Sequence, residues 1–290
     1  MMDKNIIKKS FSEAARSYDS NSELQSLVAE GLMNFLRGAD CFEKKPAYSC
    51  SVTEIPQAIT DYTPHILDIG CGTGSLTAGI KGLFPEARVH ASDIALPMLA
   101  MARQNLRDDN IGLVQADFEA LPFNDSTFDA VASSLAYQWA QDVLSAFREA
   151  WRVLKKDGLL VFSTLGPDTL RELRECYASA KSTHTHFMPF MGPDALAIEL
   201  KEAGLEVEAI ERHSELMTYE HLRGLVRALR DTGASPAPVD RAEPGLFPGL
   251  ALKRAERIYL KKYPSANGMG IQATYDVIFA AARKGSGNER

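Results

Sequence analysis

The residues best suited to chemistry lie between positions 65 and 74, where a short apolar run ends in Asp68 and glycines then occupy positions 70, 72 and 74. Glycine has no Cβ, so backbone N–H groups around it can come close to a ligand, and unusual backbone angles are open to it. The apolar run predicts a buried strand, and the glycines predict a turn into a helix that begins near Ser75. Together they predict a nucleotide-type binding turn.

The spacing of these glycines indicates which nucleotide is bound. A dinucleotide fingerprint requires its third glycine three residues after the second, so that a pyrophosphate lies on the helix N-terminus. Here the third glycine comes two residues after the second, and Ser75 follows it. Asp68 would repel a pyrophosphate but suits the cationic amino-acid end of S-adenosylmethionine (SAM). The pattern favours SAM, and the alternative is an ordinary tight turn.

A second acid follows the next predicted strand. This strand covers residues 88 to 92 and ends at Asp93, nineteen residues after Gly74. An ionised carboxylate at this place can accept hydrogen bonds from both ribose hydroxyls of an adenosine. The alternative is that Asp93 caps a predicted helix over residues 96 to 106.

Further cofactor contacts are predicted beyond the third strand, over residues 112 to 116. Asp117 can accept the adenine amino proton, and Phe118 and Met98 can pack against the ring faces. In an open α/β sheet, ligands bind outside the carboxyl ends of the strands, so these turns face one crevice. The predicted cofactor-binding set is Tyr18, Gln25, Asp68, Gly70, Cys71, Gly72, Gly74, Asp93, Ile94, Met98, Asp117, Phe118 and Leu135.

The N-terminal segment and the fourth strand supply candidates for the substrate side. Helical spacing over residues 4 to 37 predicts two helices with a break around residues 19 to 22. Phe11, Tyr18 and Gln25 stand seven residues apart and therefore share a helical face, which either packs into the core or covers the cofactor. Gln138 and Trp139 follow the strand over residues 128 to 135, at the substrate end.

Strand and helix patterns alternate from residue 65 onward, which predicts an α/β fold with a doubly wound, seven-stranded, mostly parallel sheet. The predicted organisation is an N-terminal helical cover (1 to 37), a proline-containing loop or insertion (38 to 64), a SAM-binding α/β core (65 to 219), a helical substrate or partner lobe (220 to 271), and a final strand with a polar tail (272 to 290).

The composition predicts a globular protein without a general affinity for nucleic acid or membrane. Of the 290 residues, 45% are hydrophobic and 24% are charged, and the net charge of −6 opposes attraction to nucleic acid or anionic lipid. Residues 220 to 262 nevertheless carry nine Lys or Arg against five Asp or Glu. This local excess is either a solvated face or a docking surface for an acidic partner.

Cysteine usage and hydropathy predict a soluble, cytoplasmic protein. Cys41, Cys50, Cys71 and Cys176 show no Cys-x-x-Cys pairing, which fits a reducing compartment. No apolar run approaches the roughly 18 residues of a membrane span, and the polar N-terminus is unlike a signal peptide. His184 and His186 have no acidic or cysteine ligand nearby, so no metal is expected.

These motifs make the sequence similar to class I SAM-dependent methyltransferases and, more narrowly, to the malonyl-acyl-carrier-protein O-methyltransferases of the biotin pathway. The matching pieces are residues 11 to 18 with Gln25, residues 68 to 74, Gln138 and Trp139, residues 152 to 155, residues 162 to 165 with 169 and 170, residues 229 to 234, and residues 274 to 277. The resemblance implies that SAM methylates a malonyl group on acyl-carrier protein. The methyl ester disguises the carboxylate, so that fatty-acid synthesis can elongate the chain towards pimelate.

The expected reaction is an SN2 transfer of methyl from SAM to a malonyl carboxylate. The carboxylate is already ionised at neutral pH, so no general base is needed, and in-line alignment can contribute about 7 to 11 kcal/mol. A cation or hydrogen-bond donors should stand near the carboxylate, because its desolvation is costly. The substrate-binding candidates are Tyr18, Gln138, Trp139, Arg223 and Arg227.

Three alternatives remain open from the sequence. One is a methyltransferase with a different acceptor, such as a quinone carbon or an RNA base. Another is an arginine hydroxylase that binds SAM. The hydroxylases of complex I assembly share two sequence motifs with this chain, Leu-Lys-x-Asp-Gly over residues 154 to 158 and Thr-Leu-x-Glu-Leu-Arg over residues 169 to 174. The third is a SAM-binding module or assembly factor without turnover.

Overall fold

A computed structural model describes residues 3 to 38, 63 to 108, 110 to 179, 189 to 232, 249 to 265 and 268 to 285. Nearly all of the predicted 38-to-64 loop and part of the predicted 220-to-271 lobe lie outside these ranges. The helices are α1 (Lys4–Ala14), α2 (Glu23–Gly38), α3 (Ser75–Leu83), α4 (Leu96–Leu106), α5 (Val143–Val153), α6 (Arg171–Ser179), α7 (Pro193–Glu202), α8 (Leu222–Asp231) and α9 (Gly249–Lys262), with short 3-10 turns η1 (Asp19–Asn21) and η3 (Tyr137–Trp139).

The strands form one seven-stranded sheet, as the alternation in the sequence predicts. They are β1 (His65–Ile69), β2 (Arg88–Asp93), β3 (Gly112–Gln115), β4 (Phe128–Ser134), β5 (Leu154–Leu165), β6 (Leu205–Tyr219) and β7 (Ile271–Lys284). The order is β3-β2-β1-β4-β5-β7-β6, in which β1 to β5 run parallel and β7 is antiparallel to both neighbours. Strand order reverses at β1, which lies between β2 and β4, and this is where open α/β sheets bind ligands.

The two faces of the sheet are buried by different helices. Ile66 and the same-facing residues of the neighbouring strands belong to a core that includes apolar residues of α2 and α3. Leu67 and Ile69 belong to a second core that includes residues of α5 and α7. Because successive side chains on a strand point to opposite faces, a nearly continuous apolar run such as residues 66 to 69 is what a sheet covered on both sides requires.

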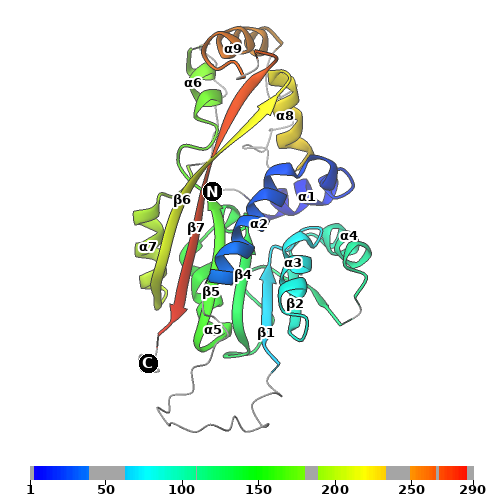
Figure 1. Ribbon diagram of the computed structural model, residues 1–290, viewed down its shortest axis with the longest axis vertical. Coiled ribbons are helices and arrows are strands. Elements are labelled where there is room, and N and C mark those ends of the chain that lie inside the picture. Colours follow the sequence, from blue (N-terminus) through cyan, green and yellow to red (C-terminus); the bar gives the residue numbers. More distant parts are fainter. Residues whose placement is uncertain are drawn as a thin grey trace.

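A lobe rises beyond the sheet on the long, paired strands β6 and β7, and α6, α8 and α9 surround their upper ends (Figure 1). Leu225 of α8, Tyr259 of α9 and Tyr177 of α6 are buried together in the core that continues from the sheet. Helix α6 therefore belongs to the lobe, although the sequence places it in the SAM-binding core. The reason is tertiary: its apolar stripe packs on α9, which lies far away in the chain.

Strand β5 differs from its prediction in where it starts. The sequence over residues 155 to 158 predicts a helix stop followed by a strand from residue 159, whereas β5 begins at Leu154 directly after α5. Asp157 adopts a φ of 60°, and the pairing with β4 shifts register between Phe128 and Ala130. The Asp-Gly pair thus makes an irregularity within the strand. No helix of the described residues is long and apolar enough to cross a membrane.

Candidate functional site

The glycine turn after β1 has the backbone conformation that its sequence predicts. Gly70, Gly72 and Gly74 have φ angles of 67°, 55° and 96°, which side-chain-bearing residues rarely adopt. A Cβ on Gly70 would lie 2.4 Å from the Cβ of Ala136, so glycine is also required by close packing against the turn after β4. The turn leads into α3, with Gly74 as its N-cap.

A cavity opens beside this turn at the carboxyl ends of the central strands, and we call it the glycine-turn cavity. It is lined by Ile7, Phe11, Tyr18, Ile69, Gly70, Gly72, Ser92, Asp93, Ile94, Met98, Ala116, Phe118, Ser134, Leu135, Ala136 and Trp139. The cavity thereby brings together eight of the thirteen residues predicted to bind the cofactor: Tyr18, Gly70, Gly72, Asp93, Ile94, Met98, Phe118 and Leu135.

Asp93 stands at the end of β2 and links the glycine turn to the next helix. Its Oδ2 accepts a hydrogen bond from the Gly72 N–H (3.0 Å), and its Oδ1 accepts one from the Ala95 N–H (2.8 Å), just before α4. Each carboxylate oxygen keeps a further lone pair for a ligand hydroxyl. Burial raises the pKa of Asp93 to about 6. The side chain thus organises the turn before α4 and still faces the cavity.

Asp68 lies beneath the turn and is fully buried within β1. Its Oδ2 accepts a hydrogen bond from the Thr77 hydroxyl (2.5 Å), whereas Oδ1 is buried and has no hydrogen-bond partner among the described residues. Burial raises the pKa of this carboxyl to about 7. A buried, unsatisfied carboxylate oxygen beside a nucleotide-type turn fits a cationic ligand group.

Five of the predicted cofactor residues do not line the glycine-turn cavity. Asp68 of β1 and Cys71 and Gly74 of the turn are buried and do not line the cavity, and Gln25 lines a neighbouring cavity instead. Asp117 is engaged elsewhere, since its Oδ2 pairs with the Nζ of Lys4 at 2.6 Å. Its predicted contact with an adenine amino group remains a prediction.

The N-terminal helices cover the glycine turn and are attached to it by polar contacts. Asp19, in η1, accepts a hydrogen bond from the Thr73 hydroxyl (2.6 Å) and another from the Asn105 side chain (3.1 Å). Phe11 of α1 packs edge-on against Trp139, with ring centroids 5.4 Å apart. These contacts favour the cover interpretation of this segment over simple core packing.

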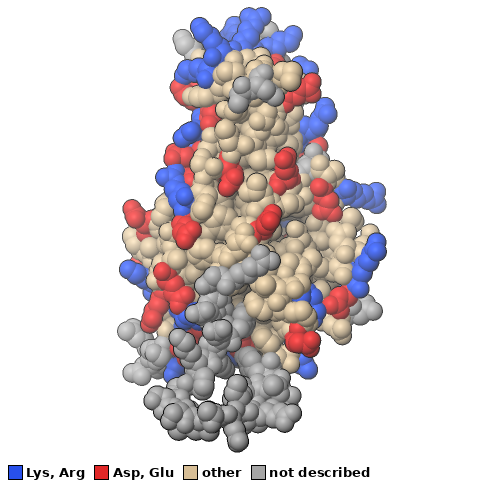
Figure 2. Space-filling view, in the orientation of Figure 1, with Lys and Arg blue, Asp and Glu red and all other residues tan. Residues whose placement is uncertain are grey.

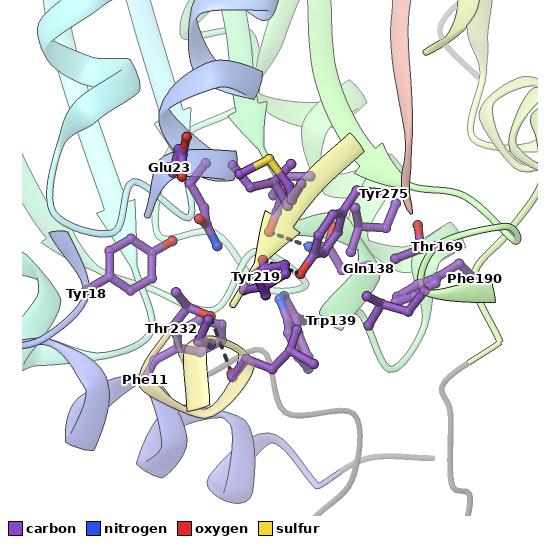
Figure 3. Close-up of a pocket in the computed structure, with 18 of the residues that line it drawn as sticks. Phe11, Tyr18, Glu23, Gln138, Trp139, Thr169, Phe190, Tyr219, Thr232 and Tyr275 are labelled. Atoms are coloured by element: carbon purple, nitrogen blue, oxygen red, sulfur yellow. Dashed lines mark hydrogen bonds between the residues drawn. The ribbon is translucent and has the colours of Figure 1, made fainter. Parts of the chain in front are cut away.

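A second cavity, which we call the lobe cavity, lies between the sheet, the N-terminal cover and the lobe (Figure 3). It is lined by Phe11, Tyr18, Ser20, Glu23, Leu24, Gln25, Leu135, Gln138, Trp139, Leu165, Thr169, Leu170, Arg174, Phe190, Met217, Tyr219, Ala228, Leu229, Thr232 and Tyr275. Four residues line both cavities: Phe11, Tyr18, Leu135 and Trp139. The two cavities therefore adjoin each other across these side chains.

The wall between the cavities contains a strained backbone. Leu135 has a φ of 51°, which is uncommon for a residue other than glycine. Its N–H donates to the Ser163 carbonyl (3.0 Å), and its carbonyl accepts a hydrogen bond from the Gln138 side chain (2.7 Å). The Gln138 Oε1 in turn accepts one from the Thr164 hydroxyl (3.2 Å). A strained backbone conformation that several surrounding hydrogen bonds hold in place is typical of functional sites.

The predicted substrate residues are only partly brought together. Tyr18, Gln138 and Trp139 line the lobe cavity, but Arg223 and Arg227 do not. Both arginines are exposed, because α8 buries Leu222, Leu225 and Leu229 and presents its arginines on the other face. The arginine that lines the cavity is Arg174, which lies on α6.

The polar side chains of the lobe cavity that were not predicted from the sequence include one arginine and two tyrosines. Arg174 is half-buried on α6, and Tyr219 and Tyr275 contribute hydroxyls that lie 3.1 Å apart. Burial raises the pKa of both tyrosines, so their hydroxyls stay protonated. In the sequence, Tyr275 lies in the stretch 274 to 277 that resembles the methyltransferase family, whereas Arg174 lies in the stretch 169 to 174 that resembles the arginine hydroxylases.

The described residues contain no group of three or more His, Cys, Asp or Glu placed to hold a metal ion. His184 and His186 lie outside the residues that the structure describes. Cys71 and Cys176 are both buried and unbridged.

Comparison with known proteins identifies the family. Residues 67 to 162, from β1 to β5, match the family described as "Methyltransferase domain". A protein of Bacillus halodurans C-125, BH2331, shares the fold with a TM-score of 0.55 and 22% sequence identity, over 77% of this chain and 94% of that one. At this identity the likeness concerns the fold alone.

Two curated relatives are more similar in sequence. The malonyl-[acyl-carrier protein] O-methyltransferase of Methylovorus sp. (strain MP688) is 33% identical over 98% of this chain and 90% of that protein. The biotin biosynthesis bifunctional protein BioHC of Saccharophagus degradans is 33% identical over 94% of this chain, which spans 45% of that longer protein. The chain therefore belongs to the malonyl-[acyl-carrier protein] O-methyltransferase family of class I SAM-dependent methyltransferases.

Proposed function

We propose that the protein transfers the methyl group of SAM to the free carboxylate of a malonyl thioester on acyl-carrier protein, an early step of biotin synthesis. The observation that carries this proposal is the pair of adjoining cavities in a chain of this family. One adjoins the glycine turn and fits an adenosyl ligand, and the other opens between the core and the lobe. A methyl donor and an acceptor bound in the two would meet at Phe11, Tyr18, Leu135 and Trp139.

The residues of the glycine-turn cavity suit each part of SAM. Asp93 offers acceptor lone pairs for the ribose hydroxyls, and Met98 and Phe118 offer apolar surfaces for the adenine ring. Asp68 lies behind the turn and does not line the cavity, so its negative charge would attract the ammonium end across the turn backbone rather than by direct contact. When bound, SAM supplies an electrophilic methyl group on a sulfonium. No metal is part of this proposal.

The protein's own contribution to the reaction is alignment and exclusion of water. A malonyl carboxylate is ionised at neutral pH, so none of the lining residues needs to act as a base. Phe11 and Trp139 close the junction of the cavities with apolar surface, and Leu135 is fixed by hydrogen bonds on both sides. A fixed, dry junction favours in-line attack, to which such alignment can contribute about 7 to 11 kcal/mol.

The proposed partner is an acidic carrier protein that docks on the basic residues of the lobe. Arg223, Arg227 and Arg230 are exposed on α8, and Lys253, Arg254, Arg257 and Lys261 are exposed on α9. Lys and Arg side chains gather where α9 forms the top of the molecule (Figure 2). Ala228 and Leu229 of α8 line the lobe cavity, so a carrier docked on α8 and α9 would stand near the cavity that is to receive its acyl group. Neither nucleic acid nor membrane is part of this proposal, and we place the reaction in the cytoplasm.

Replacing Asp93 with alanine is expected to weaken SAM binding by about 2 to 4 kcal/mol, because two hydrogen bonds to a charged acceptor are lost. Isothermal titration calorimetry measures the loss directly. Asp93→Asn keeps one acceptor oxygen for the Ala95 N–H and should lie between the wild type and the alanine variant. An unchanged affinity in Asp93→Ala would remove the ribose assignment.

SAM affinity is expected to rise with pH between about pH 5.5 and 7, by up to about tenfold per pH unit. A cationic group beside Asp68 favours its ionised form, and the pKa of about 7 means that the proton must be released on binding. The same raised pKa makes the free protein lose stability as pH rises through this window, since the folded state holds the proton more tightly than the unfolded state. Asp68→Asn should make the affinity profile less steep and leave the contribution of Asp93, whose pKa of about 6 lies in the same window. An equally steep profile in that variant would contradict the assignment of Asp68.

The chemistry of the product tests the proposed function. Label transferred from methyl-labelled SAM should be released as methanol by mild alkali, because the predicted product is an ester. Alkali-stable label would indicate methylation of carbon or nitrogen and thus a different acceptor. SAM binding without transfer would favour the non-catalytic alternative.

A further inference from the structure

The lobe cavity contains a cation whose role the proposed function leaves open. Among the described residues that line the cavity, two have charged side chains, Glu23 and Arg174. Glu23 is exposed, whereas Arg174 is half-buried on α6. A carboxylate that leaves water for a mostly apolar cavity is strongly destabilised unless a cation or several donors receive it. Arg174 is the described residue that meets this need with a full positive charge.

Arg174 differs from two nearby cations, Arg171 and Lys262, in that no carboxylate of the described residues pairs with it. The others are paired: Arg171 with Glu172 at 3.4 Å, and Lys262 with Glu175. Arg174 donates from Nη2 to the carbonyl oxygen of Pro167, and no described carboxylate forms an ion pair with it. A guanidinium has five N–H donors, so this single bond fixes its direction and leaves most of its donors for a ligand.

The segment that leads to Arg174 is held in place by β7. The Asp276 side chain accepts a hydrogen bond from the Asp168 N–H (2.9 Å), and the Thr169 hydroxyl donates to the Asp276 carbonyl (3.1 Å). The Leu170 N–H donates to the Thr274 carbonyl (2.7 Å), with Leu170 at a φ of 56°. The first turn of α6 therefore has little freedom to move, and the base of Arg174 is fixed relative to the cavity.

Two tyrosine hydroxyls supply a further donor on the same cavity. The Tyr219 and Tyr275 hydroxyls form one mutual hydrogen bond of 3.1 Å, and Figure 3 shows the two rings beside each other at the centre of the cavity. The pair has two protons, and the mutual bond uses one of them. The second proton can be donated to an oxygen of a bound ligand.

We propose that Arg174 binds the free carboxylate of the substrate and makes the enzyme select an acyl group that ends in a carboxylate. This inference rests on the proposed function and names the residue that recognises the group to be methylated. The guanidinium would hold one carboxylate oxygen by charge-assisted hydrogen bonds, which leaves the other oxygen to attack the methyl group. In this proposal Arg174, and not Arg223 or Arg227, is the arginine that binds the substrate carboxylate.

The test compares the binding of malonyl- and acetyl-acyl-carrier protein to the enzyme saturated with S-adenosylhomocysteine, so that no turnover occurs. The carrier is the same in both ligands, so docking contributes equally and the ratio of the two dissociation constants isolates the carboxylate. For the wild type we expect malonyl to be preferred by roughly 10- to 100-fold. Arg174→Gln should reduce this ratio to near one, and Arg174→Lys should restore part of it as a point charge.

Arg171→Gln is the matched control, since Arg171 begins the same helix but does not line the cavity. It should keep the wild-type ratio. A wild-type ratio in Arg174→Gln, or a ratio near one in the wild type itself, would overturn the assignment. The proposed function is judged separately by methyl transfer in the wild type, so its failure is distinguishable from failure of the Arg174 assignment.

Discussion

Gly70→Ala is expected to abolish measurable SAM binding at micromolar protein concentrations and to lower the melting temperature. The new Cβ would stand 2.4 Å from the Cβ of Ala136, at a φ of 67° that disfavours any side chain. Left-handed backbone strain costs about 1 to 2 kcal/mol, and overpacking of a close contact costs about 1 to 3 kcal/mol more. Backbone strain and overpacking would both destabilise the turn whose backbone must approach the cofactor. Calorimetric titration with SAM, together with a thermal melt, measures the effect.

The matched control is Gly82→Ala in α3, the helix that follows the same turn. A Cβ on Gly82 would meet nothing within 4 Å, so this change should leave SAM affinity intact and add about 0.5 to 1 kcal/mol of stability. A compensating change is also available. Ala136→Gly in the Gly70→Ala background removes the steric clash and should recover part of the affinity. SAM affinity within twofold of wild type in Gly70→Ala alone would contradict the close-approach explanation.

Charge reversal of Lys253, Arg254 and Arg257 on α9 is expected to raise the Michaelis constant for malonyl-acyl-carrier protein by about tenfold or more. All three side chains are exposed on α9, the helix at the top of the molecule in Figure 1. Electrostatic attraction mainly accelerates encounter with an oppositely charged partner. SAM affinity should be unchanged, because the glycine-turn cavity lies in the core. The effect should also shrink as salt is added, since exposed charges are screened.

Reversal of Lys156 and Lys201 provides a control for charge reversal outside the lobe. Both are exposed on the sheet domain, outside the lobe. Their reversal should leave the Michaelis constant close to the wild-type value. Steady-state kinetics with a small malonyl thioester completes the comparison. If the α9 variant loses as much activity with this substrate as with the carrier, the three residues are structural and the docking proposal is wrong.

The geometry of the turn proposed to bind the cofactor could be predicted because its signals are local. The strand, the acid and the alternating glycines of residues 65 to 74 are contiguous, and the positive φ angles that they require are observed. Asp93 and Phe118 follow the ends of neighbouring strands, and parallel topology places such positions along one crevice. The ion pair between Asp117 and Lys4 of α1 could not be predicted in this way, and the contact of Asp117 with adenine stays a prediction.

The lobe cavity, proposed to receive the substrate, could not be predicted because tertiary packing assembles it. The lobe cavity joins α6 to the ends of β6 and β7, which lie up to about a hundred residues away in the chain. Arg223 and Arg227 were reasonable candidates by residue type, but the leucine spacing of α8 turns them outward. Arg174 had no signal of its own, since a single arginine in a polar helix is usually a solvated residue.

The most direct measurement is methyl transfer from radiolabelled SAM to malonyl-acyl-carrier protein, with acetyl-acyl-carrier protein and malonyl-coenzyme A assayed in parallel. We expect label on the malonyl carrier, less on malonyl-coenzyme A, and none on the acetyl carrier, which has no free carboxylate. Absence of label on every malonyl substrate, with SAM still bound, would contradict the proposed reaction while leaving the fold and the cofactor site in place.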